Sequence, residues 1–306
     1  MPSRPPRERR VGVELELGGL DARAAAEVVR DWLGGTVRHL NEVEQEVDTD
    51  LGTFRIELDA TPVKKLARLG QSGGVASLAA DVVTRLATEI VPCEIVTPPL
   101  HERDLPRLDE LAVRLAKAGA RGTYDALRFA FGLHFNPELS DPTAPRILAH
   151  LRAFSLLYRW LLDEGEVDTV RRVAVYIDPF PTDYVQLIMR DDYAPSLDAL
   201  IEDYLTHNPT RNRALDMLPL FAHLDPDRVR ARVDEPLVKP RPTFHYRLPN
   251  CRVGEPGWRI MNEWQRWVRV EALAADAEEL ERARRNFGHA TDPDAIDTIK
   301  EVIGRT

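Results

Sequence analysis

The chain has 306 residues, of which 43% are hydrophobic and 30% are charged, the balance of an ordinary globular protein. Its 41 basic and 50 acidic residues give a net charge of −9, which argues against a surface that binds nucleic acid or anionic lipid. No stretch of the sequence approaches the roughly 20 apolar residues of a membrane-spanning helix. We therefore expect neither a nucleic-acid partner nor a membrane partner.

The first residues and the cysteines predict a cytoplasmic protein. Residues 1–10 have the composition of a short disordered basic tail, and a strand-like segment with glutamates follows where a signal peptide would need an apolar stretch. Cys93 and Cys251 can form at most one disulfide, and the chain has no C-x-x-C pair. We expect two reduced thiols and a single folded domain over residues 11–306.

Apolar side chains at helical spacing predict several helices of ordinary length. Asp21 is the expected N-cap of the first helix, which Gly34 and Gly35 end. Trp258, Trp264 and Trp267 are spaced for packing along a helix face, and we expect them in the core. The helical segments in chain order are 25–33, 75–86, 105–115, 147–162, 197–205 and a last region around 264–271.

Five short runs alternate between apolar and polar residues, as strands with one buried face do. Strands separated by helices predict an α+β fold in which helices cover the apolar face of a sheet. The runs are 11–17, 53–59, 93–97, 131–136 and 243–248.

The polar positions of these runs carry acids, imidazoles, an amide and arginine, but no lysine. They include Glu14, Glu16, Glu57, Asp59, Glu94, His134, Asn136, His245 and Arg247. One interpretation is an ordinary face that meets water. The other is a cation site, because clustered carboxylates repel one another unless cations are present, and Mg²⁺ and Mn²⁺ prefer carboxylate oxygens.

The spacing of Glu14 and Glu16 fits the second interpretation. Residues i and i+2 of a strand share a face about 7 Å apart, so each glutamate can hold a different metal of a phosphate-binding pair. Arg247 offers planar donors for the charge of a transferring phosphoryl group. The sequence has no P-loop and no G-x-G-x-x-G motif.

Several sequence blocks together resemble the amidoligase family. They are Gly12 to Glu16 (GVELE), 47–54 (VDTDLGTF), 93–99 (CEIVTPP), 132–137 (GLHFNP), 208–219 (NPTRNRALDMLP) and 241–250 (RPTFHYRLPN). The resemblance implies one catalytic domain over 11–306 of the carboxylate–amine ligase superfamily, which includes glutamine synthetase and γ-glutamylcysteine synthetase. It implies a curved, mainly antiparallel sheet that holds ATP and divalent metals on its polar face.

The resemblance also implies roles for residues at matching positions. Glu14 and Glu16 would serve different metal ions, and Glu94 resembles the glutamate of an E-x-x-[ST]-P element. His134 resembles a metal-ligating or phosphate-facing histidine. Asn136 would meet the nucleotide or the carboxylate substrate.

The last strand departs from the family pattern R-x-E-x-R. It keeps Arg247 but has His245 where a metal-binding glutamate would stand. A neutral imidazole can replace a carboxylate as ligand, yet it lowers the negative charge of the site by one, so the metal should bind more weakly or prefer Mn²⁺.

Other charged residues keep two interpretations each. Arg211 and Arg213 either form a salt-bridge cluster with Asp216 or bind the substrate carboxylate. Arg241 is treated likewise, as a structural or nucleotide-binding residue. Glu57 and Asp50 also have two interpretations. They bind a metal or the ammonium of the attacking amine, or they make surface or structural salt bridges.

The implied function is an ATP- and Mg²⁺- or Mn²⁺-dependent ligase that forms an amide through an acyl phosphate. Its substrates would be a small-molecule or peptide carboxylate and an amine, and a glutamine amidotransferase-like partner supplies ammonia to some relatives. The alternatives are a phosphotransferase of the guanidino-kinase type, a catalytically silent binding or scaffold protein, and a metal-dependent hydrolase, which the lack of H-E-x-x-H disfavours.

Overall fold

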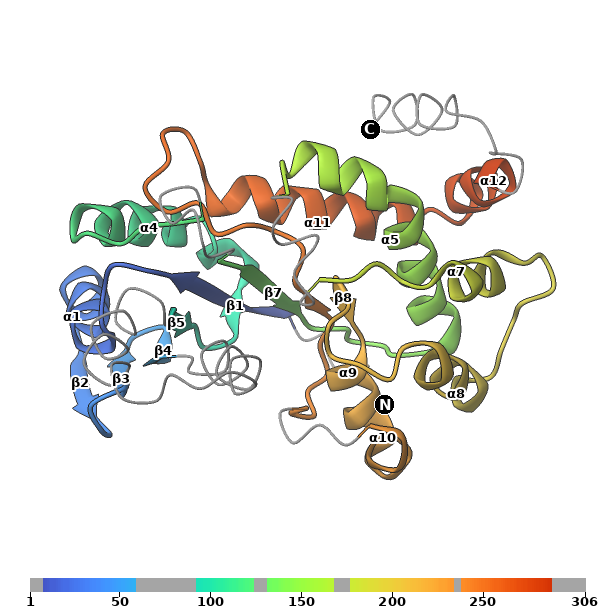
Figure 1. Cartoon of the computed structure of the whole chain (residues 1–306). Coiled ribbons are helices and arrows are strands. Elements are labelled where there is room, and N and C mark those ends of the chain that lie inside the picture. The colour runs from blue at the N-terminus through green and yellow to red at the C-terminus, as the bar shows by residue number, and fades with distance from the viewer. Residues whose placement is uncertain (1–7, 59–91, 124–130, 168–176, 234–237, 288–306) are drawn as a thin grey trace, which may run out of the picture. The chain divides into compact units, whose positions relative to one another are not determined.

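The computed structural model describes residues 8–58, 92–123, 131–167, 177–233 and 238–287 (Figure 1). The elements in chain order are β1 (Arg10–Leu17), α1 (Ala22–Leu33), β2 (Thr36–His39), β3 (Glu44–Thr49), β4 (Gly52–Leu58), β5 (Cys93–Val96), β6 (Leu100–His101), a 3-10 turn (Glu102–Asp104), α4 (Arg107–Lys117), β7 (Leu133–Pro137), α5 (Ala144–Glu164), α7 (Thr182–Met189), α8 (Leu197–His207), β8 (Leu215–Asp216), α9 (Leu218–Leu224), α10 (Pro226–Arg232), β9 (His245–Tyr246), α11 (Ile260–Ala275) and α12 (Ala277–Phe287).

The chain divides into two compact units, which are described separately. The sheet unit comprises residues 10–135 and 249–261, and the helical unit comprises 1–9, 136–248 and 262–306. The division falls within β7 and within α11, so both elements contain residues of each unit. The single domain expected from the sequence stays a prediction.

The sheet unit is built on a mostly antiparallel sheet. Its strands follow the order β2-β3-β4-β5-β1-β7, and β6 pairs with the start of β1. The register places Leu15 opposite Ile95, and Ile95 opposite Ile56, so that the apolar side chains of three strands lie on one face. All three are fully buried. The expected α+β class and antiparallel sheet are confirmed.

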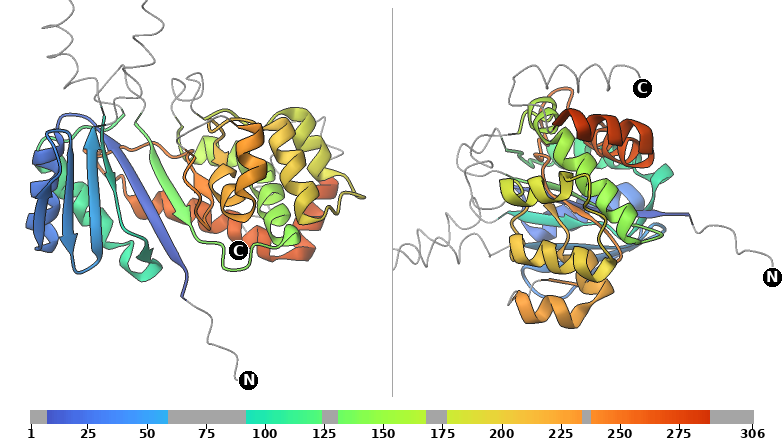
Figure 2. Two further views of the ribbon diagram at one scale, coloured as in Figure 1. Left: turned by 90° about the horizontal axis from the view of Figure 1, so that it is seen from below. Right: turned by 90° about the vertical axis from the view of Figure 1, so that its right-hand side faces the viewer.

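Helix α1 covers this apolar face. Asp21 caps the helix as expected, with its carboxylate accepting the N–H of Ala24 at 2.7 Å, and Gly34 ends it at φ 75°. The helix packs against β3, β4 and β5 and contacts α4 (Figure 2). With one face of these strands covered by helices, the glutamates at alternate positions lie on the other face.

The helical unit is organised around α5. This helix contacts α7, α8 and α12, and edge-to-face aromatic contacts join successive helices. The ring centroids are 5.9 Å apart for Phe154 and Phe180, 5.4 Å for Phe180 and Tyr184, 5.8 Å for Tyr184 and Tyr204, and 5.1 Å for Tyr204 and Phe221. In the same unit β8 pairs antiparallel with β9, and Phe244 bonds through its N–H to the carbonyl of Pro137.

The predicted helices within the described ranges form with small shifts at their ends. Residues 105–115, 147–162, 197–205 and 264–271 lie in or overlap α4, α5, α8 and α11. Segment 75–86 and Asp59 lie outside the described residues. Trp264 and Trp267 are fully buried, but Trp258 precedes α11 and is half-buried, so its expected place on the helix face was wrong. Trp258 lies between the turn at Gly257 (φ 82°) and the first residue of α11, Ile260.

The last predicted strand, 243–248, is shorter than the alternation suggests. Only His245 and Tyr246 form β9. The alternation did not predict β2 and β3. β2 is a largely exposed four-residue edge strand, and β3 carries Glu or Gln at half of its positions. Pairing with neighbouring strands, rather than local hydrophobicity, determines which residues of these three segments form strands.

Neither cysteine forms a disulfide. Cys93 and Cys251 are both buried free thiols. Burial, followed by the negative charges of Asp21 and Glu94, raises the pKa of the Cys93 thiol well above its ordinary value. Within the described ranges, no helix has both the length and the apolar character needed to cross a bilayer.

The turn between β3 and β4 generates a test of the sheet unit. Gly52 has φ 118°, and a Cβ atom there would lie 2.9 Å from Cβ of Pro98. We expect Gly52→Ala to lower the free energy of unfolding by about 2 kcal/mol, because backbone strain and a close contact add. Gly34→Ala is the control, since Gly34 also has a positive φ but open space around its Cβ position. Urea unfolding measures both, and an equal or smaller loss for Gly52→Ala would contradict the close contact.

Candidate metal centre

The polar face of the sheet unit is partly buried rather than simply hydrated. Glu14 on β1 is 8% exposed and His134 on β7 is 4% exposed. Glu16 and Glu94 are half-buried on the same face. Burial of a carboxylate without compensation is costly, so these groups need partners of opposite charge or hydrogen-bond donors. The interpretation of a water-facing surface is therefore wrong for Glu14 and His134.

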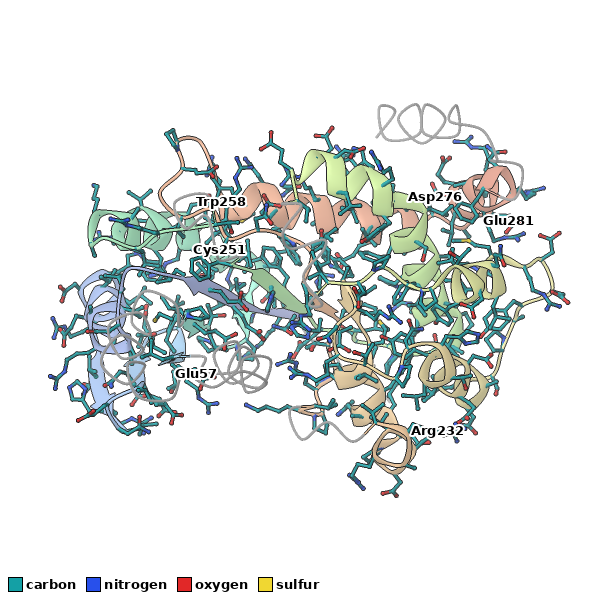
Figure 3. The ribbon with its side chains drawn as sticks, in the orientation of Figure 1. Glu57, Arg232, Cys251, Trp258, Asp276 and Glu281 are labelled. Atoms are coloured by element: carbon teal, nitrogen blue, oxygen red, sulfur yellow. The ribbon has the colours of Figure 1, made fainter. Side chains whose placement is uncertain are left out.

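Four glutamates form a row across four neighbouring strands. The register places Glu16 of β1 opposite Glu94 of β5, Glu94 opposite Glu57 of β4, and Glu57 opposite Glu44 of β3. Directly opposite Cβ atoms in a sheet lie about 5 Å apart, and like charges at that distance destabilise the pairing. Glu57 is labelled in Figure 3. The sequence showed which face each residue takes, but not the register that aligns them.

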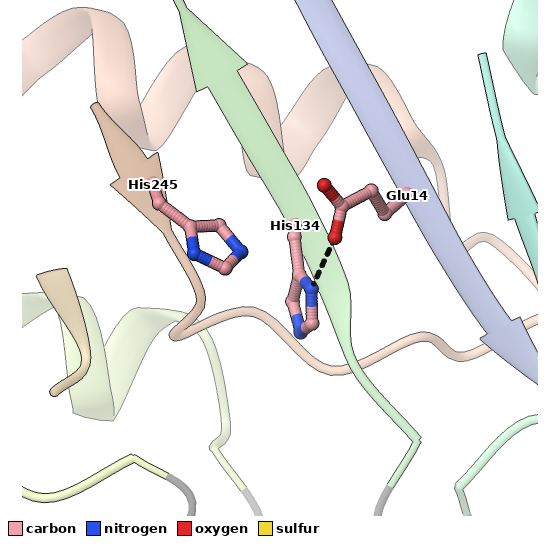
Figure 4. Close-up of side chains that lie close together, drawn as sticks. All are labelled: Glu14, His134 and His245. Carbon is pink, nitrogen blue, oxygen red and sulfur yellow. Dashed lines mark hydrogen bonds and ion pairs between the residues drawn. The ribbon is translucent and has the colours of Figure 1, made fainter. Parts of the chain in front are cut away.

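His134 lies between the two glutamates of β1. Its Nδ1 is 3.1 Å from Oε2 of Glu14, and its Nε2 is 3.7 Å from Oε1 of Glu16. Figure 4 draws the contact with Glu14 as a dashed line. Because an ionised carboxylate only accepts hydrogen bonds, Nδ1 carries the proton in this contact, and Nε2 of a neutral ring presents its lone pair on the Glu16 side.

The backbone orients Glu16. The N–H of Gly132, the residue before β7, donates to Oε2 of Glu16 at 2.6 Å, and the N–H of Glu16 donates to the carbonyl of Gly132 at 2.9 Å. One carboxylate oxygen is thus held by the chain, while the other lies toward His134. Such hydrogen bonds fix a ligand before an ion arrives and strengthen the site.

The E-x-x-T-P element has a structural role in addition to its glutamate. Thr97 accepts the N–H of Val13 through its hydroxyl oxygen at 2.9 Å, and its own N–H donates to the carbonyl of Val13 at the same distance. These bonds join the end of β5 to β1 directly beside Glu14. The threonine therefore fixes the alignment that brings Glu94 opposite Glu16.

The ligand atoms of Glu16, Glu94 and His134 can meet one ion. One atom from each lies within 4.8 Å of those of the other two. Ligands of one divalent cation with bonds of 2.0–2.3 Å are about 3 Å apart in octahedral geometry, so small side-chain movements would close the site. Two carboxylates and one imidazole suit Mn²⁺ or Mg²⁺, with imidazole favouring Mn²⁺ of the two.

The remaining predicted site residues lie in the helical unit. Asn136 is buried at the end of β7, and His245 is buried on β9. In β8–β9, Asp216 stands directly opposite His245, and its Oδ2 is 3.3 Å from Nδ1 of the imidazole. The structure thus groups Glu14, Glu16, Glu57, Glu94 and His134 in the sheet unit, and Asn136, Arg211, Arg213, Arg241, His245 and Arg247 in the helical unit.

The predicted arginines contact main-chain groups. Arg213 donates to the carbonyls of Pro179 at 2.7 Å and of His207 at 3.4 Å. Arg247 donates through a side-chain nitrogen to the carbonyl of Arg211. Arg241 bonds through its backbone N–H to Pro219. The side-chain contacts position the guanidinium groups of Arg213 and Arg247. The roles of the four arginines toward a nucleotide or substrate stay predictions.

Sequence reasoning missed two residues that organise the site. Gly132 acts through its backbone, which no side-chain pattern reveals, although its place two residues before His134 in the strand motif was a signal. Asp216 was considered only as a partner of Arg211 or Arg213, but its carboxylate contacts His245. Asp50, the candidate named together with Glu57, is exposed in the β3–β4 turn.

Repulsion within the glutamate row can be measured on metal-free protein. Glu16→Gln keeps an oxygen for the N–H of Gly132 but removes one charge, so we expect the free energy of unfolding in EDTA to rise by up to about 1 kcal/mol. Glu44→Gln at the end of the row is the control, with an expected change within about 0.5 kcal/mol. Urea unfolding at neutral pH gives both values. Clear destabilisation by Glu16→Gln would show that the negative charge is already compensated by the protein.

The comparisons with known proteins agree with the motifs. The sequence model of the family described as "Putative amidoligase enzyme" matches residues 7–269. Searches of curated proteins and of solved structures gave no match. The family match contains both glutamates of β1, the glutamate of β5, the histidines of β7 and β9 and the arginines between α8 and β9. The chain belongs to the amidoligase family.

Proposed function

We propose that this protein is an ATP-dependent carboxylate–amine ligase with a fold like that of glutamine synthetase. The observation that carries the proposal is the cluster of Glu16, Glu94 and His134 on one face of a mostly antiparallel sheet, in a chain of the amidoligase family. Amide formation from a carboxylate requires activation, and a γ-phosphate held by divalent cations supplies it. The donor set favours such cations.

The proposed reaction has two steps. A carboxylate oxygen of the acid attacks the γ-phosphorus of ATP, an O–P bond forms, and ADP leaves with the electrons of the β–γ bond. The amine nitrogen then attacks the acyl carbon, phosphate leaves, and the nitrogen loses a proton. The protein's task is to position both substrates and to balance the charge of the phosphoryl group.

The residues of the sheet unit have proposed roles that follow from their contacts. Glu14, Glu16, Glu94 and His134 would hold Mg²⁺ or Mn²⁺, which polarises the phosphate oxygens. The hydrogen bond from Gly132 keeps Glu16 in place during the reaction. Glu57, next in the row after Glu94, would attract the ammonium of the amine and take its proton.

Residues of the helical unit would bind the anionic groups. We propose Arg247 for the equatorial oxygens of the phosphoryl group, Asn136 and Arg241 for the nucleotide, and Arg211 and Arg213 for the substrate carboxylate. His245 is proposed as a further ligand of a divalent cation. A glutamine amidotransferase-like partner would supply ammonia if ammonia is the amine.

Nucleotide binding is the first test of this function. We expect ATP to bind in calorimetry only when Mg²⁺ or Mn²⁺ is present, and the double variant Glu14→Ala with Glu16→Ala to weaken binding at least about tenfold, because two carboxylates are lost from the metal site. Glu44→Ala with Glu46→Ala is the matched control, since it removes two glutamates at the same i, i+2 spacing from the same face of β3. An equal loss of ATP affinity in both double variants would contradict the assignment. ATP binding of the same strength with and without the metal would also contradict it.

Amine-dependent release of inorganic phosphate then distinguishes a ligase from a kinase, because both release ADP. Wild-type protein with metal, ATP and a panel of carboxylates and amines should release phosphate only when both an acid and an amine are present. Phosphate transfer to one substrate without dependence on an amine would favour the phosphotransferase. No metal-dependent ATP binding by folded protein would leave the scaffold hypothesis.

A further inference from the structure

A buried acid and a buried histidine face each other in the helical unit. Asp216 of β8 and His245 of β9 are a directly opposite pair, so their side chains leave the same face of the two-stranded ladder. Asp216 is 0% exposed and His245 is 3% exposed. Figure 4 labels His245 on its strand. A carboxylate at a fully buried position of a strand costs desolvation energy, so packing alone does not explain why an acid stands there.

The opposite face of the same two strands is ordinary core. Leu215 and Tyr246, the neighbouring pair in the register, are both buried, and the ring of Tyr246 lies 5.1 Å from that of Trp267. The apolar pair thus supplies the packing of β8 and β9. Stability of the ladder does not require an acid at position 216, because an apolar residue there would avoid the desolvation cost.

The two oxygens of Asp216 have separate partners. Oδ1 accepts the N–H of Leu218 at 2.9 Å, at the start of α9, and Oδ2 lies 3.3 Å from Nδ1 of His245. The bond to Leu218 fixes the rotation of the carboxylate. Burial, and then the negative charge of Asp216, raise the pKa of Tyr204, so this neighbouring phenol stays neutral and adds no second negative charge beside Asp216.

The hydrogen-bonding capacity of the two groups shows which of them carries the shared proton. An ionised carboxylate can only accept a hydrogen bond, so Nδ1 of His245 donates. In the neutral ring the lone pair is then on Nε2, the nitrogen that does not contact the carboxylate. This is the arrangement by which proteins fix the tautomer of histidines that bind metal ions.

We propose that Asp216 is a positioning residue that holds His245 in the Nδ1–H tautomer and so makes Nε2 its metal-binding atom. The proposal extends the function above, because it takes His245 as a ligand of a divalent cation. Asp216 itself touches neither substrate nor metal and acts through the imidazole.

The tautomer can be read from metal-free protein, independently of any activity. Nitrogen-15 NMR of histidine-labelled protein, with the His245 signals assigned by their loss in His245→Ala, should show Nδ1 protonated and Nε2 unprotonated at neutral pH. Asp216→Asn keeps an oxygen for Leu218 but presents an amide N–H₂ to Nδ1, so we expect the variant to change to the Nε2–H tautomer. The same tautomer in wild type and variant would overturn the proposal.

Metal affinity gives the second readout. Calorimetry with Mn²⁺ alone should show affinity about 10–100-fold lower for Asp216→Asn, the usual effect of losing the partner behind a metal-binding histidine. Asp216→Asn should have no further effect in a His245→Ala background. Asp225→Asn is the matched control, since Asp225 also accepts a backbone N–H, at the start of α10 in the same unit.

The outcomes separate this proposal from the proposed function. Wild-type protein that binds no Mn²⁺ would contradict the ligase assignment, while the NMR result would still decide the role of Asp216. Unchanged Mn²⁺ affinity in folded Asp216→Asn, or an equal further loss in the His245→Ala background, would overturn the positioning role. An altered tautomer together with weaker Mn²⁺ binding would support it.

Discussion

Electrostatic repulsion between carboxylates on neighbouring strands is the constraint on which the account of this protein depends. Glu16, Glu94, Glu57 and Glu44 stand directly opposite one another across four strands. A sheet selected for stability alone would alternate charges or use threonine at such positions. Cations among the acids would offset this repulsion. Ligand atoms of Glu16 and Glu94 lie within 4.8 Å of each other and of a ring nitrogen of His134. We therefore propose that ion binding, rather than folding stability, accounts for the acidic face.

Secondary contacts prepare the proposed ligands. The N–H of Gly132 holds Glu16, the hydroxyl of Thr97 joins β5 to β1, and Asp216 lies behind His245. Each of these contacts joins residues of the same unit, so each unit positions its own proposed ligands. Compared with a glutamate at the same position, a neutral His245 lowers the negative charge of a metal site by one. With Asp216 at 3.3 Å, the histidine brings a negative charge with it.

Strand alternation predicted the residues of the polar face but not their neighbours. The face taken by Glu14 or Glu57 follows from the period of two residues. The cap at Asp21 follows from the preference of N-cap positions for short side chains whose oxygen accepts a backbone N–H. The register is decided by pairing partners far apart in the chain, which a local pattern does not contain, so the row ending at Glu44 was missed. The dyad of Asp216 and His245 was missed for the same reason, because 29 positions separate the two.

Diffraction from crystals soaked in Mn²⁺, with anomalous differences recorded at the manganese edge, tests the central claim most directly. The account predicts an anomalous peak within about 2.3 Å of carboxylate oxygens of Glu16 and Glu94 and of Nε2 of His134, the distance range of hard divalent cations. That peak should disappear in the Glu16→Ala variant. A structure with well-ordered side chains, saturating Mn²⁺ and no peak at these three residues would contradict the claim.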